Sequence, residues 1–594
     1  MLRRAIVIGT TGGAGARVAG FLSLLGIEWE PLTAEALISR HGPEILAGRE
    51  IQACLIMSGE AVRDLKSELD RRRIPAPLMS RSFAGSLFHS FDQSPASLRA
   101  LESFLSGAKI AASKLSAGPL RYRVSDKYPD MCRALSGLSF ASTERAEDCG
   151  IQFELRDGIA DTIIKIDEAS LLTHVCEGSR EVFVASSPEI LDLQELASKN
   201  VDFRTCFSRV VPILLALRHL FRGSCWAPEA HYANIIIDDP PLWPRYGHLD
   251  LRELAALVDR TGCACTIAMI PWNHRRSDRR AVSLMAGRPS RLGVCVHGCN
   301  HTGAEFGCQD QERLTGMLLT ARRRMDAHQQ LTGLPYQPVM VFPQGVFSIE
   351  AMSCLGIGGY LAAVNTEVAD CRRQARLTLQ DLLDPAVLRY DGPPLFTRRR
   401  PGDGPVNFAV DSFLGKPCLV VLHHDFFKGG IKNLEELVRT FMNFHPELSW
   451  DSLENIVKGC ALSKRGADGR RTIRIFANQA VIRVGQARGE ELTVEKRDVD
   501  QDKISRVELD HRVVDVSFEN GFLKLVLEPP TDRMVSVSIV TAESPAVRVT
   551  EDSVGEKTRV AMRRYLCEFR DNYLAKSETL WRCARGVAKS FERH

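Results

Sequence analysis

Three groups of acid, base or metal-binding side chains each stand directly after an apolar run in the middle of this 594-residue chain. The groups are Asp238 with Asp239, His297 with His301, and His423 with His424. Each preceding run is typical of a buried strand, and α/β folds place their sites at the carboxyl ends of such strands. We therefore expect the three groups to meet in one site.

The second group predicts a metal ion. His297 and His301 are four residues apart, so both imidazoles reach one cation if a helical turn starts after the strand. Two imidazoles and one carboxylate, with positions left for water, are the usual ligands of a hydrolytic divalent site. Asp239 would supply the carboxylate. Zinc fits imidazole-rich ligation best, although the set also admits other first-row metals.

A thiolate site is an alternative in the same segment. Cys295, Cys299 and Cys308 lie close together in the sequence, but their spacings match no common structural zinc pattern.

Strands must alternate with helices to position these groups. The expected strands span residues 234–237, 263–270, 291–296, 339–342 and 419–422, and the expected helices span 249–261 and 312–332. Such alternation predicts a parallel sheet or a barrel.

The order of the motifs resembles the polysaccharide deacetylase family, the NodB-homology carbohydrate esterases, over about residues 231–460. The family's Asp-Asp motif carries a catalytic base followed by a metal ligand, which implies Asp238 as base and Asp239 as ligand. Its H-(Ser/Thr)-x-x-H motif carries two further ligands, which implies His297 and His301.

The late Leu-x-His motif of that family carries a histidine acid. Leu422-His423 matches it loosely, which implies His423 as the acid. His424 is a competitor for this role, and consecutive residues on a strand face opposite sides, so only one of the two should reach the pocket.

Three positions depart from the family pattern. Gly298 replaces a hydroxyl residue, Pro240 replaces a glycine, and Val341 stands where the family has an arginine that tunes the base. Another cation must then set the pKa of the base, and Arg245, Arg275 or the metal are the candidates.

The resemblance implies an irregular (β/α) barrel that removes an acyl group, such as acetyl, from an N-acylated sugar or glycan precursor. Trp272 and Asn273 offer an aromatic ring and an amide for a sugar, or else a structural loop. The alternative is a catalytically degenerate protein that binds carbohydrate or serves in an assembly. Val341 favours this alternative, whereas the intact ligand set opposes it.

The whole chain is predicted to be an α/β multidomain protein. A Rossmann- or flavodoxin-like α/β unit (1–115) and a β-rich connector (118–205) precede the barrel (225–460), and a small β-sandwich (470–548) and a C-terminal helical tail (557–594) follow it. A glycine turn at residues 9–15 admits a nucleotide-dependent enzyme as a third interpretation, but it lacks the G-x-G-x-x-G spacing.

Composition limits the partners and the compartment. With 77 Lys+Arg against 73 Asp+Glu the net charge is only +4, which argues against nucleic acid as a partner. An odd number of cysteines, 17, and an N-terminal apolar run without a cleavage site predict a cytoplasmic protein. The basic C-terminal helix is expected to pack on its own protein or to contact a membrane surface or partner protein.

Overall fold

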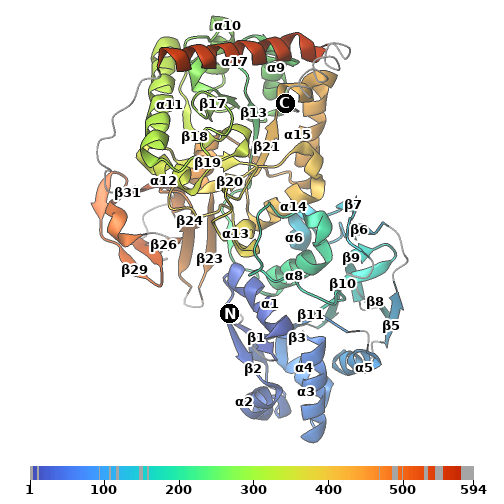
Figure 1. The fold of residues 1–594 in the computed structure, drawn as a ribbon. Helices are drawn as coiled ribbons and strands as arrows, with labels where there is room; N and C mark the ends of the chain where they lie inside the picture. The colour runs from blue at the N-terminus through green and yellow to red at the C-terminus, as the bar shows by residue number, and fades with distance from the viewer. Residues whose placement is uncertain are drawn as a thin grey trace.

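Figure 1 shows the computed structural model. It describes residues 4–9, 12–92, 94–105, 109–114, 119–145, 151–156, 160–178, 180–466, 469–484, 492–497, 500–527, 533–541 and 553–576.

The N-terminal part is a layered α/β structure. Its parallel strands follow the order β2-β1-β3-β4, as in doubly wound folds. The strands are β1 (Arg4–Ile8), β2 (Trp29–Leu32), β3 (Ile51–Ser58) and β4 (Phe83–His89). The helices are α1 (Gly13–Leu24), α2 (Ala34–Leu46), α3 (Gly59–Arg71), α4 (Ala76–Ser82) and α5 (Pro95–Phe104). Thr10 and Thr11 of the glycine turn lie outside the described residues.

The β-rich connector continues this same sheet. Strand β11 pairs in parallel with β4, and β10, β9, β6 and β7 follow in order, so that one 11-stranded sheet spans both expected units. The added strands are β5 (Lys109–Lys114), β6 (Arg121–Val124), β7 (Ser139–Ala141), β8 (Ile151–Arg156), β9 (Ala160–Ile166), β10 (Ala169–Glu177) and β11 (Arg180–Ala185). Pairing with β11 satisfies the backbone of β4, which would otherwise be a sheet edge. The short helix α6 (Pro129–Cys132) and the apolar helix α8 (Phe207–Leu220) pack together on this part.

The middle of the chain is a nearly closed parallel barrel. Its strands follow the order β20-β19-β18-β17-β16-β13-β21, and every pairing between them is parallel. They are β13 (Tyr232–Asp238), β16 (Cys265–Met269), β17 (Leu292–His297), β18 (Gln337–Val341), β19 (Ala362–Asn365), β20 (Leu395–Thr397) and β21 (Cys418–Leu422). Arg399, just beyond β20, closes the ring through hydrogen bonds with the backbone of Leu419 and Val421, both 2.9 Å long.

Helices surround these strands. They are α9 (Leu251–Thr261), α10 (Arg279–Ala286), α11 (Gln311–Thr332), α12 (Ile349–Ile357), α13 (Leu379–Leu383), α14 (Pro405–Leu414), α15 (Lys432–Phe444) and α16 (Leu453–Gly459). Short strands β14 (Arg245–Tyr246), β15 (Leu249–Asp250) and β22 (Ser449–Trp450) accompany them.

The alternation of side chains along the strands decides which residues reach the barrel mouth. Ile236 and Cys295 lie in the apolar cluster inside the barrel, whereas Ile235 and Ile237 pack in the cluster that includes the outer helices. Because strand side chains alternate, Asp238 and His297, two residues further on, continue the inward face at the carboxyl end. This alternation explains why the polar groups that follow the strands meet at one end of the barrel.

Two further sheets share one apolar core, and their strands follow the barrel in the chain except for β12, which precedes it. One sheet contains β12 (Ala227–Pro228), β23 (Ala461–Arg465), β24 (Arg471–Ile475), β26 (Leu492–Arg497), β29 (Ser517–Glu519) and β30 (Phe522–Leu527). The other contains β25 (Gln479–Val484), β27 (Ile504–Leu509), β28 (Arg512–Val514) and β31 (Arg533–Thr541). Asn520 and Gly521 join β29 to β30 with φ of 52° and 79°, the positive values that a type I′ turn requires.

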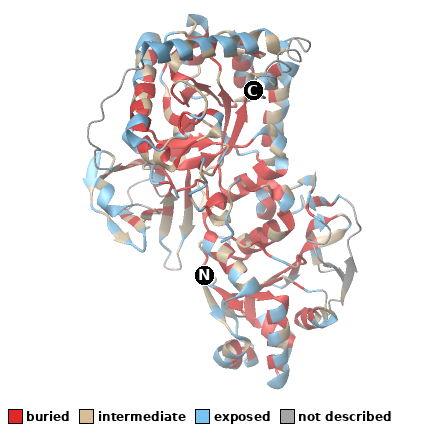
Figure 2. Cartoon of the chain, viewed as in Figure 1, coloured by how far each residue is buried: buried red, intermediate tan, exposed pale blue. Residues whose placement is uncertain are grey.

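The last described helix, α17 (Val554–Asn572), crosses the barrel at the end where α9, α10 and α11 are seen (Figure 1). Figure 2 shows that the barrel strands are buried while much of α17 faces solvent. Residues 577–594 of the predicted tail lie outside the described residues. In the described part of the chain, no helix is both long and apolar enough to cross a membrane.

Candidate active site

The predicted ligands Asp239, His297 and His301 lie together at the barrel mouth. Asp239 Oδ1 lies 3.3 Å from Nε2 of His297 and 3.1 Å from Nε2 of His301. One ligand atom from each residue lies within 4.8 Å of the other two. The sequence prediction therefore selects three side chains that the fold places around one point.

The hydrogen bonding of this triad suits a cation. Nδ1 of His297 donates to the Val341 carbonyl oxygen at 3.0 Å, which leaves the lone pair of Nε2 directed at the other two ligands. The contacts of Asp239 Oδ1 are with the two imidazole Nε2 atoms, and His301 Nδ1 is buried without a hydrogen-bond partner in the described structure. Burial opposes the charge of Asp239, but the two imidazoles hold the pKa of its carboxyl well below the ordinary value.

Two of the three ligands have strained backbones. Asp239 has φ of 83° and His301 has φ of 56°, in the region that residues with a Cβ rarely adopt. Such strain persists where surrounding structure over-determines it, and it clusters at functional sites.

Residues 298–302 form an irregular loop, so His297 and His301 come together without a helical turn. The carboxylate of Glu305 holds the loop by accepting hydrogen bonds from the backbone N–H groups of Cys299 at 2.8 Å and His301 at 3.0 Å. Two more come from the N–H groups of Asn300 and Thr302, each at 3.2 Å. A carboxylate that collects four amides takes the place of the helical hydrogen bonds. This role of Glu305 was not predicted from the sequence.

Gly298 is required by the same loop. A Cβ at this position would lie 2.4 Å from Glu305 Oε1 and 2.4 Å from Pro343 Cγ, and the residue has φ of 64°. The hydroxyl residue of the family pattern therefore has no room here, because the supporting carboxylate and the Pro343 loop occupy its space.

The predicted base, Asp238, is paired with an arginine that was not predicted from the sequence. Arg398 donates from Nη1 and Nη2 to the two carboxylate oxygens of Asp238, both at 2.7 Å, and each side chain is only 4% exposed. Burial raises the pKa of Asp238, but the charges of Arg398 and His297 outweigh it and hold the pKa below the ordinary value.

Arg398 thus supplies the guanidinium that is missing at Val341. We expected Arg245 or Arg275 to set the pKa of the base. This is wrong for Arg245, which pairs with Asp250 at 2.7 Å. Arg398, rather than Arg275, is bound to the base. Val341 contributes its backbone instead, since its carbonyl oxygen accepts from Nδ1 of His297 and from the N–H of Gly298.

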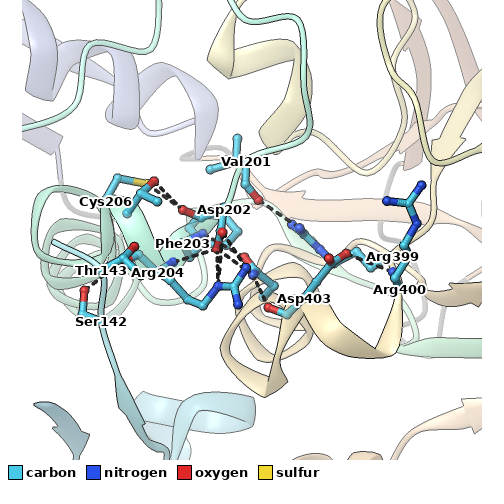
Figure 3. A network of polar contacts seen from close by, with 12 residues as sticks. Ser142, Thr143, Val201, Asp202, Phe203, Arg204, Cys206, Arg399, Arg400 and Asp403 are labelled. Atoms are coloured by element: carbon cyan, nitrogen blue, oxygen red, sulfur yellow. Dashed lines mark hydrogen bonds and ion pairs between the residues drawn. The ribbon is translucent and has the colours of Figure 1, made fainter. Parts of the chain in front are cut away.

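Arg398 reaches the base because the chain beyond β20 stays extended, so that neighbouring side chains point to opposite sides. Arg399 points outward, where it binds Asp411 and donates from Nη1 to the Val201 carbonyl oxygen at 2.9 Å. Figure 3 shows this outer network, in which Arg399 donates to the Val201 carbonyl oxygen and the neighbouring Asp202 pairs with Arg204. The outer contacts anchor the segment that carries Arg398.

The two late histidines have different surroundings. His423 is exposed, and it is one of the groups that lower the pKa of the Asp238 carboxyl. His424 instead lies under Gly247, and its Nε2 is 3.4 Å from Asp571 Oδ1 on α17. The alternation therefore places His423 toward the base and His424 toward the covering helix.

Helix α17 binds loops that follow four barrel strands. Its residues bind the loop after β13 through Tyr246 and Asp571 at 2.6 Å, and the loop after β16 through Arg276 and Glu568 at 2.6 Å and 2.8 Å. Further contacts are Arg564 with the His301 carbonyl oxygen at 3.2 Å, and Asp571 with His424. The C-terminal helix therefore covers part of the mouth, and the expectation that it packs on its own protein is confirmed for these residues.

The remaining candidates have structural partners. Trp272 lies beside the guanidinium of Arg324 at 5.1 Å, and the amide oxygen of Asn273 accepts from Arg276 at 3.2 Å. Neither of the two groups of potential metal ligands in the described ranges contains Cys295, Cys299 or Cys308. The described residues therefore give the thiolate alternative no support.

No family model matches this chain, and no curated protein matches it significantly. Among solved structures, the chain is similar to Agd3, a carbohydrate deacetylase, with 8% identity and a TM-score of 0.48 over 91% of this chain and 99% of that one. It is also similar to a family 4 carbohydrate esterase from Streptomyces lividans, with 14% identity and a TM-score of 0.24 over 37% and 92% of the two chains. A family 4 pseudoenzyme from Bacillus anthracis gives 9% identity and a TM-score of 0.24 over 37% and 64%.

These similarities are too low to carry an activity to this chain. The solved structures similar to this chain include carbohydrate deacetylases and family 4 carbohydrate esterases.

Proposed function

We propose that the chain is a metal-dependent amide hydrolase that removes an acetyl group from an N-acylated sugar or glycan precursor. The observation that supports this best is the arrangement at the barrel mouth. Three convergent ligands, Asp239, His297 and His301, lie beside a second, ion-paired carboxylate, Asp238.

A divalent cation, with zinc as the best fit to the ligands, would polarise the acyl oxygen and activate a water molecule when bound by the triad. Asp238 is suited to accept the proton from that water because its pKa lies below the ordinary value and it is ionised at neutral pH. Arg398 holds both carboxylate oxygens, which fixes the orientation of the base.

His423 is suited to protonate the departing amine. Without a proton the amine is a poor leaving group, and the tetrahedral intermediate returns to the amide. The side chain of His423 is exposed, so it can exchange protons with solvent.

The ion pair between Asp238 and Arg398 also supports the alternative, a catalytically degenerate protein. A carboxylate bound at both oxygens by a guanidinium is a weaker base, which favours a degenerate barrel that holds a metal and a sugar without turnover. The two proposals predict the same metal content and differ only in catalysis.

The test is metal analysis of the purified protein followed by acetate release from a panel of N-acetyl sugars. We expect about one metal ion at the triad and release that Asp238→Asn lowers by about 10²–10⁴ while the metal is retained. A metal-loaded protein that binds these sugars but releases no acetate would establish the degenerate alternative.

A further inference from the structure

A second group of metal-binding side chains lies in the N-terminal part, far from the barrel mouth in the sequence. His174 of β10, Glu181 of β11 and His219 of α8 each offer a ligand atom within 4.8 Å of the other two. This group belongs to neither the proposed reaction nor the loops around α17.

Strand register places a further donor, Cys176, beside this group, although its Sγ atom is not within 4.8 Å of all three other ligand atoms. Cys176 stands directly opposite Glu181 in the antiparallel pair of β10 and β11, and His174 stands opposite Phe183. Since residues two apart share a face, His174 and Cys176 both project toward the same side as Glu181. Helix α8 packs on β10 and β11 and brings in His219.

One distance already has the value of tetrahedral ligation, and the others require small side-chain movements. The Sγ atom of Cys176 lies 3.6 Å from Nε2 of His174. With zinc–nitrogen and zinc–sulfur bonds of about 2.1 Å and 2.3 Å, two ligands of one tetrahedral ion stand about 3.6 Å apart. On the other side, Nε2 of His219 lies 2.6 Å from Oε1 of Glu181, so these two atoms would separate by about 0.8 Å to hold an ion between them.

The surroundings resemble a closed structural site. His174 is 5% exposed and its ring stacks on Phe183 at 4.5 Å, which fixes the imidazole plane. The side chains of Glu181 and His219 are 15% and 14% exposed. Cys176 lies at the exposed rim of the group.

The charges balance around a divalent ion. A glutamate and a cysteine thiolate would neutralise it, and the thiol proton would leave to solvent on binding. Arg222 approaches Glu181 at 3.7 Å, but its side chain is 66% exposed and can turn outward.

We propose that His174, Cys176, Glu181 and His219 bind a second zinc ion, which clamps helix α8 to strands β10 and β11. Because a folded site binds the ion and an unfolded chain does not, the ion would stabilise this part of the fold.

The experiment counts zinc in the full chain after chelation, reloading and dialysis, with folding checked by circular dichroism. We expect about two equivalents in the wild type, one in His297→Ala/His301→Ala and one in His174→Gln/His219→Gln. The control is His41→Gln, which removes a histidine whose Nδ1 lies 2.7 Å from Glu44 but which belongs to neither group, and it should keep two.

A folded His297→Ala/His301→Ala variant that holds no zinc would overturn the second site, and so would two equivalents in His174→Gln/His219→Gln. The His297→Ala/His301→Ala variant also tests whether Cys176 binds the metal as a thiolate. Loaded with cobalt(II), it should show a thiolate-to-cobalt charge-transfer band that Cys176→Ser abolishes, and absence of that band would overturn the four-ligand assignment. Failure of the proposed deacetylase activity would leave these outcomes unchanged.

Discussion

The barrel mouth and the face of β10 each bring two imidazoles and one carboxylate together, but they differ in what surrounds the ligands. At the mouth, Asp239 and His301 stand on strained backbone beyond the strand ends, beside a second carboxylate and the exposed His423. In the N-terminal group, His174 and Glu181 stand within regular strands and face a helix. Ligand type alone therefore does not separate a site for reaction from a site for stability. The difference lies in the neighbouring groups, the ion-paired carboxylate of Asp238 and the imidazole of His423.

The strongest test of this contrast removes the mouth ligands. His297→Ala/His301→Ala should abolish acetate release, because no cation remains to polarise the acyl group, while the fold persists. Acetate release and circular dichroism measure the two effects. Wild-type turnover in this variant would show that the triad is not part of the reaction.

Replacing Asp238, the carboxylate beside the triad, should lower acetate release nearly as much. Asp238→Asn keeps the shape of the side chain but removes the base, so kcat should fall by about 10²–10⁴ with unchanged metal content. Steady-state kinetics and elemental analysis test this together. Hydrolysis at the wild-type rate would remove Asp238 from the role of base.

Removing Arg398, the ion-pair partner of Asp238, tests how the proposed base is held in position. Arg398→Leu leaves the buried charge of Asp238 unpaired, so the free energy of unfolding should fall by about 3–5 kcal/mol. Arg398→Lys restores the charge without the two parallel hydrogen bonds and should recover part of the stability. Denaturant unfolding measures both, and an unchanged midpoint in Arg398→Leu would contradict the ion pair.

The two late histidines sharpen the assignment of the acid. His423→Ala should lower kcat by about 10²-fold or more, whereas His424→Ala should have a mild effect on rate because His424 contacts Asp571 on α17. The same acetate assay compares them. The reverse pattern would assign the acid to His424 and leave the rest of the mechanism in place.

The smallest effect on rate is expected in the N-terminal group. His174→Gln/His219→Gln should lower the Tm of the zinc-loaded protein but leave kcat unchanged, since no catalytic group lies there. A thermal scan and one kinetic measurement suffice. A loss of kcat comparable to that of Asp238→Asn would erase the contrast between the two groups.

Local patterns in the sequence predict much of the barrel and the three side chains that meet at its mouth. The strands at 234–237 and 419–422 lie within β13 and β21, and the helix expected at 312–332 is α11. Asp239, His297 and His301 could be named because an apolar run followed by a polar residue indicates a strand end, and strand ends meet in parallel folds.

Only the tertiary structure decided which charges and loops support those ligands. Arg398 meets Asp238 across 160 residues of sequence, and Glu305 replaces a helical turn by collecting backbone amides. The cover of α17 over the mouth and the sheet shared by β4 and β11 are likewise contacts between distant segments. Periodicity and spacing report the conformation of neighbouring residues, whereas these contacts depend on how finished elements pack. The types of side chain were therefore readable from the sequence, but their partners were not.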